Sequence, residues 1–301
     1  MEASRKALNM LLIYHLVAAM APLSRRAVTL GAATAAISAP VIPAAHAASG
    51  ADTSYTVLQS RLEVPVVKSP GFSPSGSTLP ALPEWVVGDW EATQTLVRFS
   101  TPLGVQYIGA PGRPLSEAEA SAAQTREQIG KPIALNLRFS SYRGGAAEDR
   151  AFNAMSRYDA FAGKPVVREA ASCEAGNAAA DLLAGQPQAC TVIDFKGPVQ
   201  QKLLVNALRV GRSSDDAAFV ASELTRGIFA RKIAPGDTRN FQPITTDTET
   251  VIELSRGASP DELRGRLRLV SYLQPMDPLY FSAGGQSVSI SDYSLSLVRR
   301  R

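Results

Sequence analysis

Residues 133–140, with the sequence IALNLRFS, alternate between apolar and polar side chains. Their odd-numbered positions are Ile, Leu, Leu and Phe, and most of their even-numbered positions are polar. This period of two is typical of a β-strand that buries one face. Residues 265–273, GRLRLVSYL, repeat the pattern with leucines on one face and arginines on the other. The two stretches predict a sheet with one face in a hydrophobic core.

Most of the chain after residue 165 shows similar strand-like segments divided by turns. The predicted strands are 90–100, 133–140, 165–173, 190–196, 201–210, 218–231, 248–256, 265–273 and 287–299. In the last of them the apolar positions change phase after Ile290, which predicts a β-bulge at Ser291-Asp292. Many short strands and few helices predict a sandwich or a barrel.

Two segments follow helical periodicity. Residues 115–129 begin near Ser116, a favourable N-cap, and end before Gly130. Residues 148–162 place aromatic side chains near helical spacing and end before Gly163. We therefore expect a mainly β fold with two inserted helices.

The first 47 residues differ in composition from the rest and predict a targeting presequence. Arg25 and Arg26 precede an uncharged stretch of small and apolar residues, in which Ala45 and Ala47 flank a small-x-small cleavage site. This order is typical of a twin-arginine export signal. A shorter apolar run lies upstream, so the presequence is predicted to be bipartite, as in plastid proteins bound for the thylakoid lumen. The alternatives are a transmembrane helix and a wrongly assigned start codon on a periplasmic protein.

The remaining chain divides into a lead-in and one domain. Residues 48–82 are interrupted by Pro and Gly and predict an irregular lead-in, and residues 83–301 predict a single domain. The presequence carries four of the 31 basic and one of the 27 acidic residues, so its removal leaves a net charge of +1. Such a balanced charge argues against a general nucleic-acid-binding surface.

Common catalytic signatures are missing from the predicted domain. Both histidines, His15 and His46, lie in the presequence, so a Ser-His-Asp or Cys-His site cannot form after its removal. Lys131 and Lys164 follow glycine but precede proline, which excludes a phosphate-binding loop. No cofactor and no metal site are predicted.

Carboxylates leave one enzymatic alternative open. The acid pairs Glu148-Asp149 and Asp215-Asp216 are candidates for glycoside-type chemistry, although adjacent acids point apart on a strand. Glu223 and Arg226 are expected to form a structural ion pair. The sequence therefore leans against an enzyme.

The two cysteines lie at the end of one predicted strand and the start of the next. Cys173 and Cys190 are therefore candidates for a disulfide across a hairpin, as exported proteins tolerate. Closing such a loop stabilises a fold by about 3 kcal/mol in the chain-entropy treatment. The alternatives are two free thiols or, with only half the ligands present, a zinc site.

Gly88-Asp89-Trp90 begins the first long strand. It resembles the Gly-x-Trp opening of lipocalin-like (calycin-type) barrels. This resemblance implies an antiparallel β-barrel whose floor is closed by the Trp90 indole, with Arg299 of the last strand lying over it. A guanidinium on an indole contributes about 1 to 2 kcal/mol when it is shielded from water. The alternative is that Trp90 is an ordinary core residue.

Four further motifs indicate a family. They are LPxWxxGxW at 82–90, TPLG at 101–104, AEDRxFN at 147–153 and GRLRL at 265–269. Over roughly residues 80 to 300 the chain resembles a domain family of unknown function from thylakoid-lumen proteins of plants and algae, with cyanobacterial relatives. The resemblance implies one domain in the chloroplast thylakoid lumen, with the bacterial periplasm as the alternative. It implies no activity.

We expect such a barrel to bind an apolar small molecule, a pigment or a lipid, in its mouth. The alternative is an assembly or maintenance factor that docks on a photosynthetic complex through residues 64–80. Either protein would be peripheral to a membrane at most.

Overall fold

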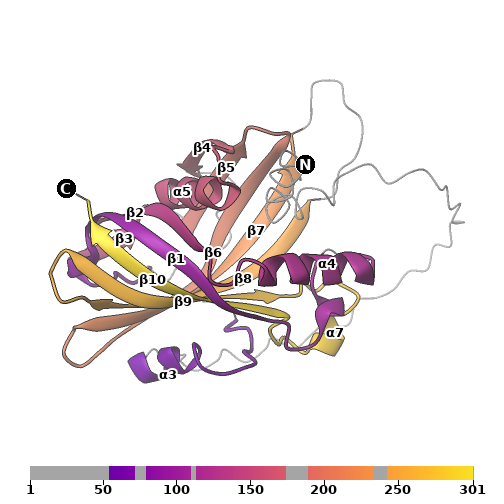
Figure 1. The fold of residues 1–301 in the computed structure, drawn as a ribbon, viewed down its shortest axis with the longest axis horizontal. Helices are drawn as coiled ribbons and strands as arrows, with labels where there is room; N and C mark the ends of the chain where they lie inside the picture. Colours follow the sequence, from indigo (N-terminus) through magenta and orange to yellow (C-terminus); the bar gives the residue numbers. More distant parts are fainter. Residues whose placement is uncertain (1–53, 72–78, 110–112, 174–188, 233–242, 301) are drawn as a thin grey trace, which may run out of the picture.

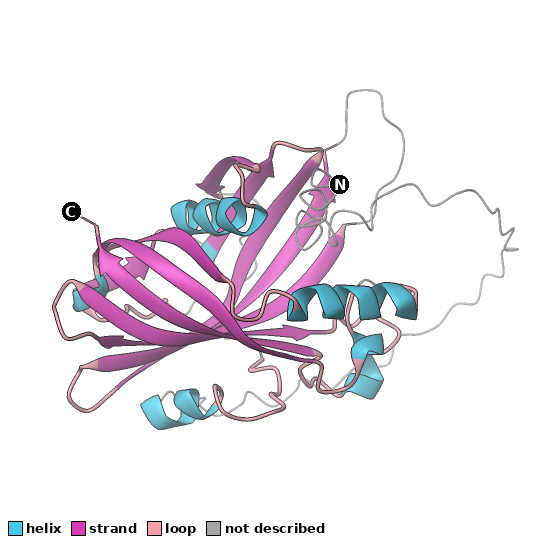
Figure 2. Cartoon of the chain, viewed as in Figure 1, coloured by secondary structure: helices cyan, strands magenta, loops and turns pink. Residues whose placement is uncertain are grey.

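The computed structural model describes residues 54–71, 79–109, 113–173, 189–232 and 243–300. They form one antiparallel sheet of ten strands that curls into a half-barrel (Figure 1; Figure 2). The strands are β1 (Gly88–Ser100), β2 (Pro132–Tyr142), β3 (Gly145–Glu148), β4 (Val167–Ser172), β5 (Cys190–Phe195), β6 (Val199–Arg212), β7 (Ala218–Arg231), β8 (Ile244–Arg256), β9 (Glu262–Tyr272) and β10 (Ser289–Arg299). The helices of this part of the chain are α3 (Tyr55–Ser60), α4 (Leu115–Arg126), α5 (Arg150–Ala162) and α7 (Tyr280–Ala283), with 3-10 turns η1 (Glu84–Val86) and η2 (Val105–Tyr107).

The strand order is β3-β2-β1-β10-β9-β8-β7-β6-β5-β4. The first and last long strands are neighbours, and Trp90 lies opposite Arg299. The ring of strands would close if β3 met β4, but these two strands are the edges of the sheet. The predicted mainly β, antiparallel architecture is confirmed. The sheet curls as in a barrel, but among the described residues it stays open between β3 and β4.

Helix α5 connects the two edge strands in sequence and packs against β2, β4 and β5. On the β2 side, the backbone N–H groups of Asn136 and Arg138 donate to the side chains of Ser156 (2.8 Å) and Asn153 (2.7 Å). On the β4 side, Asp159 accepts hydrogen bonds of 2.7 and 3.0 Å from two backbone N–H groups at the start of β4. Helix side chains thus satisfy backbone groups that a neighbouring strand would otherwise bind.

Residues 54–71, which we call the strap, cross the convex face of the sheet. Figure 1 shows α3, the helix of the strap, on the opposite side of the sheet from α5. Leu58 and Leu62 of the strap are buried against Val220 and Val251. This part of the expected irregular lead-in therefore has a helix and contributes to the core.

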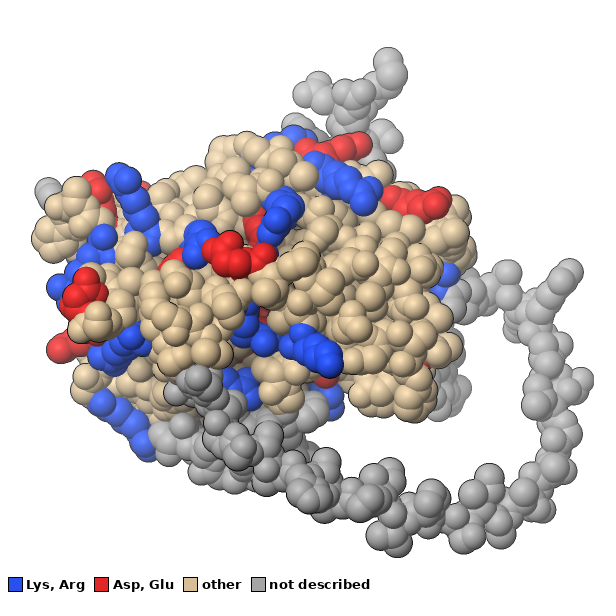
Figure 3. All heavy atoms as spheres, turned by 90° about the horizontal axis from the view of Figure 1, so that it is seen from below, with Lys and Arg blue, Asp and Glu red and all other residues tan. Residues whose placement is uncertain are grey.

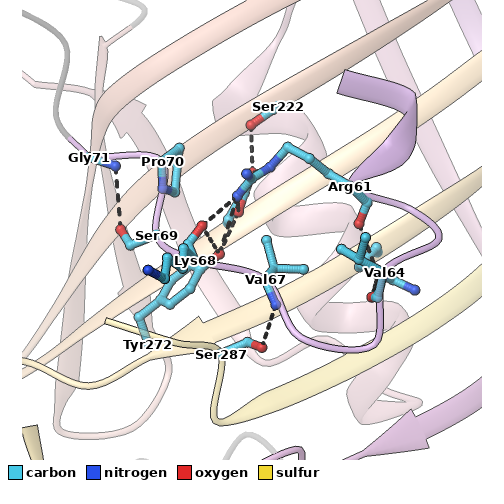
Figure 4. A network of polar contacts seen from close by, with 12 residues as sticks. Arg61, Val64, Val67, Lys68, Ser69, Pro70, Gly71, Ser222, Tyr272 and Ser287 are labelled. Carbon is cyan, nitrogen blue, oxygen red and sulfur yellow. Dashed lines mark hydrogen bonds and ion pairs between the residues drawn. The ribbon is translucent and has the colours of Figure 1, made fainter. Parts of the chain in front are cut away.

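Buried polar contacts also hold the strap (Figure 4). Glu249 of β8 is fully buried and accepts hydrogen bonds from Arg61 at 2.7 and 2.5 Å. Ser222 and Tyr272 donate to the same carboxylate, each at 2.6 Å. Four donors replace the water that this anion loses on burial.

A second buried charge fixes the turn of the strap. Arg268 has no exposed surface and donates to Asp292 at 2.6 Å and to the carbonyl oxygens of Arg61 at 2.9 Å and Val64 at 2.7 Å. Seen from below, most of the surface belongs to uncharged residues, and basic and acidic side chains lie next to one another in several places (Figure 3).

The change of phase in the last strand has a different cause from the predicted one. Strand β10 pairs with β9 without a slip, and the register shift lies in β1 between Leu96 and Arg98. Ile290 is buried on the convex face because it packs in one cluster with Val67 of the strap. The predicted bulge at Ser291-Asp292 is therefore wrong, and the extra residue is Val97 of the partner strand.

The two predicted helices correspond to α4 and α5, and each predicted strand overlaps an observed one. Helix α4 begins after Pro114, which replaces Ser116 as the N-cap. Strand β3 was not predicted, because its four residues follow a glycine turn and show no alternation. No described helix is both long and apolar enough to span a bilayer.

Candidate binding cavity

A cavity of about 300 Å³ lies between the concave face of the sheet and helix α5. One wall comes from β5 to β9, and the other comes from α5, β1, β2 and β3. Leu79, Pro80 and Leu82, which precede β1, also line it. The cavity therefore lies where a closed barrel would have its interior.

One end of the cavity is apolar. On the neighbouring strands β7 and β8, Phe219 lies opposite Leu254, and Ala221 lies opposite Ile252. Leu267 of β9 lies beside Ile252. All five side chains line the cavity, and Phe219 and Leu254 are fully buried. This end forms an apolar floor.

The other end is polar. The cross-strand pairs that continue from the floor are Glu223 with Thr250, Thr225 with Thr248, and Gly227 with Thr246. The hydroxyl of Thr225 donates to Glu223 at 3.0 Å. By contrast, the described residues offer no hydrogen-bond partner to the hydroxyls of Thr246, Thr248 and Thr250, which we call the threonine row. The cavity thus changes from apolar to hydroxyl-lined along the strands.

Four charged side chains form a cluster beside Thr250, the member of the threonine row nearest the floor. Arg150 at the start of α5 donates to both oxygens of Glu223, each at 2.6 Å. Glu148 accepts from Arg157 at 2.6 Å and from the amide of Asn153 at 3.0 Å. Two cations therefore face two anions, and the cluster has no net charge.

The cluster keeps Glu148 ionised. Burial by itself raises the pKa of a carboxyl group, but the charges of Arg157 and Arg150 and the Asn153 hydrogen bond outweigh burial and lower the pKa of Glu148 to about 2. A group with such a pKa carries no proton near neutral pH. Glu148 therefore cannot act as a general acid there.

The carboxylates that the sequence offered for catalysis do not form an acid–base pair. Glycoside-type chemistry needs one carboxyl group that is protonated near neutral pH. Glu148 is ionised, and Asp149 instead caps α5 by accepting from the N–H of Phe152 at 3.1 Å. Asp215-Asp216 lies in the turn between β6 and β7 and does not line the cavity.

The expected pair between Glu223 and Arg226 is wrong. The two side chains lie on opposite faces of β7: Glu223 faces the cavity, while Arg226 donates to both oxygens of Asp247 at 2.9 Å. Side chains alternate between the two faces of a strand, so residues three positions apart, such as Glu223 and Arg226, point to opposite faces. The cationic partner of Glu223 is instead Arg150, which belongs to the cavity lining.

The three residues predicted at the junction of the first and last strands lie together, outside the cavity lining. The guanidinium carbon of Arg299 lies 4.3 Å from the ring centre of Trp90, and Trp90 Nε1 donates to the Val86 carbonyl oxygen at 2.8 Å. Gly88 has a φ of +138°, and a Cβ atom there would lie 2.3 Å from Arg299 Nη1. Glycine is therefore required for the arginine to reach the indole.

A disulfide joins Cys173 and Cys190, whose Cα atoms are 5.4 Å apart. It links the end of β4 to the start of β5, next to Thr191 of the cavity wall. Arg25, Arg26, Ala45 and Ala47 lie outside the described residues. Within the described ranges, no group of His, Cys, Asp and Glu is arranged to hold a metal ion.

The threonine row had a signal in the sequence that our sequence analysis missed. Residues 245–250, TTDTET, place threonines at 246, 248 and 250 and acids at 247 and 249. This alternation gives β8 one hydroxyl face and one acidic face. The pairing of Arg150 with Glu223 had no such local signal, because 73 positions separate the two residues.

A family model described as a domain of unknown function (DUF6816) matches residues 80–301. The chain belongs to this family. The match includes every strand of the sheet and helices α4, α5 and α7, whereas the strap precedes it. Comparison of the chain with curated proteins and with solved structures finds no match. The DUF6816 domain thus contains all the residues that line the cavity except Leu79.

Proposed function

We propose that the DUF6816 domain binds a small molecule with an apolar chain in its cavity and catalyses no reaction on it. The observation that carries this proposal is the apolar floor of Phe219, Ala221, Ile252, Leu254 and Leu267. An apolar concavity of this kind is a common ligand site. Both carboxylates of the cavity lining, Glu148 and Glu223, accept hydrogen bonds from arginines, which supports binding over catalysis.

The size of the cavity favours a lipid-like chain over a pigment ring. About 300 Å³ is at the lower end of small-molecule sites. This volume suits a single acyl or isoprenoid chain better than a large pigment ring.

The lipocalin-like identity and the location belong to the same proposal. The Trp90–Arg299 contact supports the likeness to lipocalin-like barrels, although the opening between β3 and β4 sets this sheet apart from a closed barrel. We place the protein in the thylakoid lumen, with the periplasm as the alternative, on the basis of residues 1–47 alone. A lumenal protein with this cavity would carry a lipid beside the membrane.

The test is binding by the full-length chain. We expect lipid in an organic extract of the purified protein, and a rise in its thermal midpoint on addition of a long-chain alcohol. Leu269 faces the cavity and is half-buried, so Leu269→Trp should fill the cavity and abolish both effects. Leu115→Trp, on an exposed position of α4, is the matched control and should preserve them. A wild-type protein with no extractable lipid and no thermal shift would refute the proposal.

A second candidate, docking on a photosynthetic complex, has a different observation in its favour. Met276, Leu279 and Phe281 lie in the connection between β9 and β10 with 68%, 36% and 85% of their surfaces exposed. Residues 64–71 of the predicted docking segment already contact the sheet, so this connection is the better contact. Phe281→Ser should then abolish co-migration with a membrane complex in a native gel and leave lipid binding intact.

A further inference from the structure

The cavity has features that define the polar end of its ligand, and the inference from them rests on the function proposed above. Thr246, Thr248 and Thr250 project from alternate positions of one strand into the cavity, and the described chain leaves their hydroxyls unpaired. A hydroxyl can both donate and accept a hydrogen bond. A purely apolar ligand would remove water from these groups and offer nothing in return, which costs affinity. The ligand therefore needs a polar group near the threonine row.

The charged cluster next to the threonine row determines whether that polar group carries a charge. Both terminal nitrogens of Arg150 donate to Glu223, and Arg157 donates to Glu148. The side chains of Arg150 and Glu223 are only 15% and 16% exposed. A ligand carboxylate or phosphate would add a third anion to two anions and two cations. One of the anions would then be left without a partner in a poorly hydrated site, which is strongly unfavourable.

The positions along the strand determine the orientation. The threonine row continues the cross-strand ladder from Ile252 and Leu254 of the floor. A chain in the floor therefore places its polar end beside Thr250 and Thr248. The charged cluster lies at the level of Thr250, because Glu223 is its direct cross-strand neighbour.

We propose that the cavity takes an uncharged amphiphile: a single apolar chain with a hydroxyl or carbonyl group that forms hydrogen bonds with Thr248 and Thr250. The chain occupies the floor and the polar group occupies the threonine row. The site selects against a fatty acid anion of the same length, because its own charges already cancel.

The experiment compares three probes of one chain length on the full-length protein at pH 7: tetradecanol, tetradecanoate and tetradecane. We expect tetradecanol to bind the wild-type protein at least tenfold more tightly than tetradecanoate. Thr248→Val and Thr250→Val keep the side-chain shape and remove the hydroxyl. Each should weaken tetradecanol binding by about five- to tenfold, as the loss of one hydrogen bond does, and leave tetradecane binding unchanged or stronger.

Thr245→Val is the matched control. It removes a hydroxyl from the same strand at a position that does not line the cavity, and it should change none of the three affinities. Tighter binding of tetradecanoate than of tetradecanol, or unchanged tetradecanol binding in both threonine variants, would overturn this inference and leave the proposed function standing. Failure of all three probes to bind the wild-type protein would overturn the proposed function as well. The wild-type ranking does not depend on the folding of any variant.

Discussion

Strand β8 has buried charges next to both of its faces, but another segment of the chain, the strap, covers the charges on the convex face only. On the convex face, Glu249 is enclosed by the strap and by four hydrogen bonds. On the concave face, the cluster of Arg150 and Glu223 lies beside Thr250 and borders the cavity. Similar chemistry therefore has two outcomes. On the convex face, the strap covers the charges and they stabilise the fold. On the concave face, the charges line a cavity that can accept a ligand.

The largest expected effect comes from breaking the charge network on the convex face. Glu249→Ala removes the acceptor for Arg61, Ser222 and Tyr272 together. We expect a loss of about 3 kcal/mol in the free energy of unfolding, because Arg61, whose side chain is only 21% exposed, is left without its partner. Denaturation in urea, followed by circular dichroism, measures this loss.

The control for this variant is Asp89→Ala. It breaks an ion pair with Arg138 whose side chains are 49% and 43% exposed, and it should cost no more than about 1 kcal/mol. If the two variants lost equal stability, the convex network would be no more than a surface ion pair.

A smaller loss of stability is expected at low pH from Glu148, which lines the cavity on the concave face. The pKa of Glu148 falls from 4.5 to about 2 on folding, because the charges of Arg157 and Arg150 outweigh burial. Since the pKa of the folded state is the lower one, the contribution is fully present above pH 4.5 and is lost as the pH falls toward 2. Its size is on the order of 3 kcal/mol.

The measurement is the free energy of unfolding between pH 6 and pH 2 for the wild-type protein and Glu148→Gln. The variant should be less stable near pH 6, and the difference should shrink as the pH approaches 2. A constant difference over this range would mean that the arginines do not hold Glu148 ionised.

The two faces also differ in how far the sequence predicted them. Alternation within 133–140 and 265–273 is local, and it correctly predicted strands and an antiparallel sheet. Closure depends on whether β3 and β4 pair, which no local pattern specifies. Helix α5 instead binds to strands on both sides of the opening through the polar side chains of Asn153, Ser156 and Asp159, whereas its helical pattern in the sequence is carried by aromatic residues.

The candidate sites show the same limit. Cys173 and Cys190 could be paired from the sequence because they flank one hairpin, whereas the contact of Arg299 with Trp90 was implied by the resemblance to lipocalin-like barrels. The strap could not be placed. Arg61 and Glu249 are 188 positions apart, and their contact depends on the path of a segment rich in proline and glycine.

The smallest expected effect tests whether each arginine under the strap is needed. Arg209 is half-buried and donates to the Pro70 carbonyl oxygen at 2.9 Å, but its Nη1 is buried without a partner among the described residues. Burial, together with the nearby charge of Arg61, lowers the pKa of Arg209, so the fold disfavours its charge. Arg209→Met keeps most of the apolar stem and removes that charge. We expect the free energy of unfolding to change by no more than about 1 kcal/mol, with either no loss or a gain.

Arg61→Met is the matched substitution, and it should cost several times more, because it leaves Glu249 buried without its cation. Urea denaturation of the two variants side by side separates the cases. If Arg209→Met lowered the free energy of unfolding as much as Arg61→Met, then both paired and unpaired charges under the strap would stabilise the fold. The two faces of the sheet would then differ only in the presence of the cavity. A neutral Arg209→Met with a damaging Arg61→Met would instead show that the strap is held by its paired charges and merely tolerates the unpaired one.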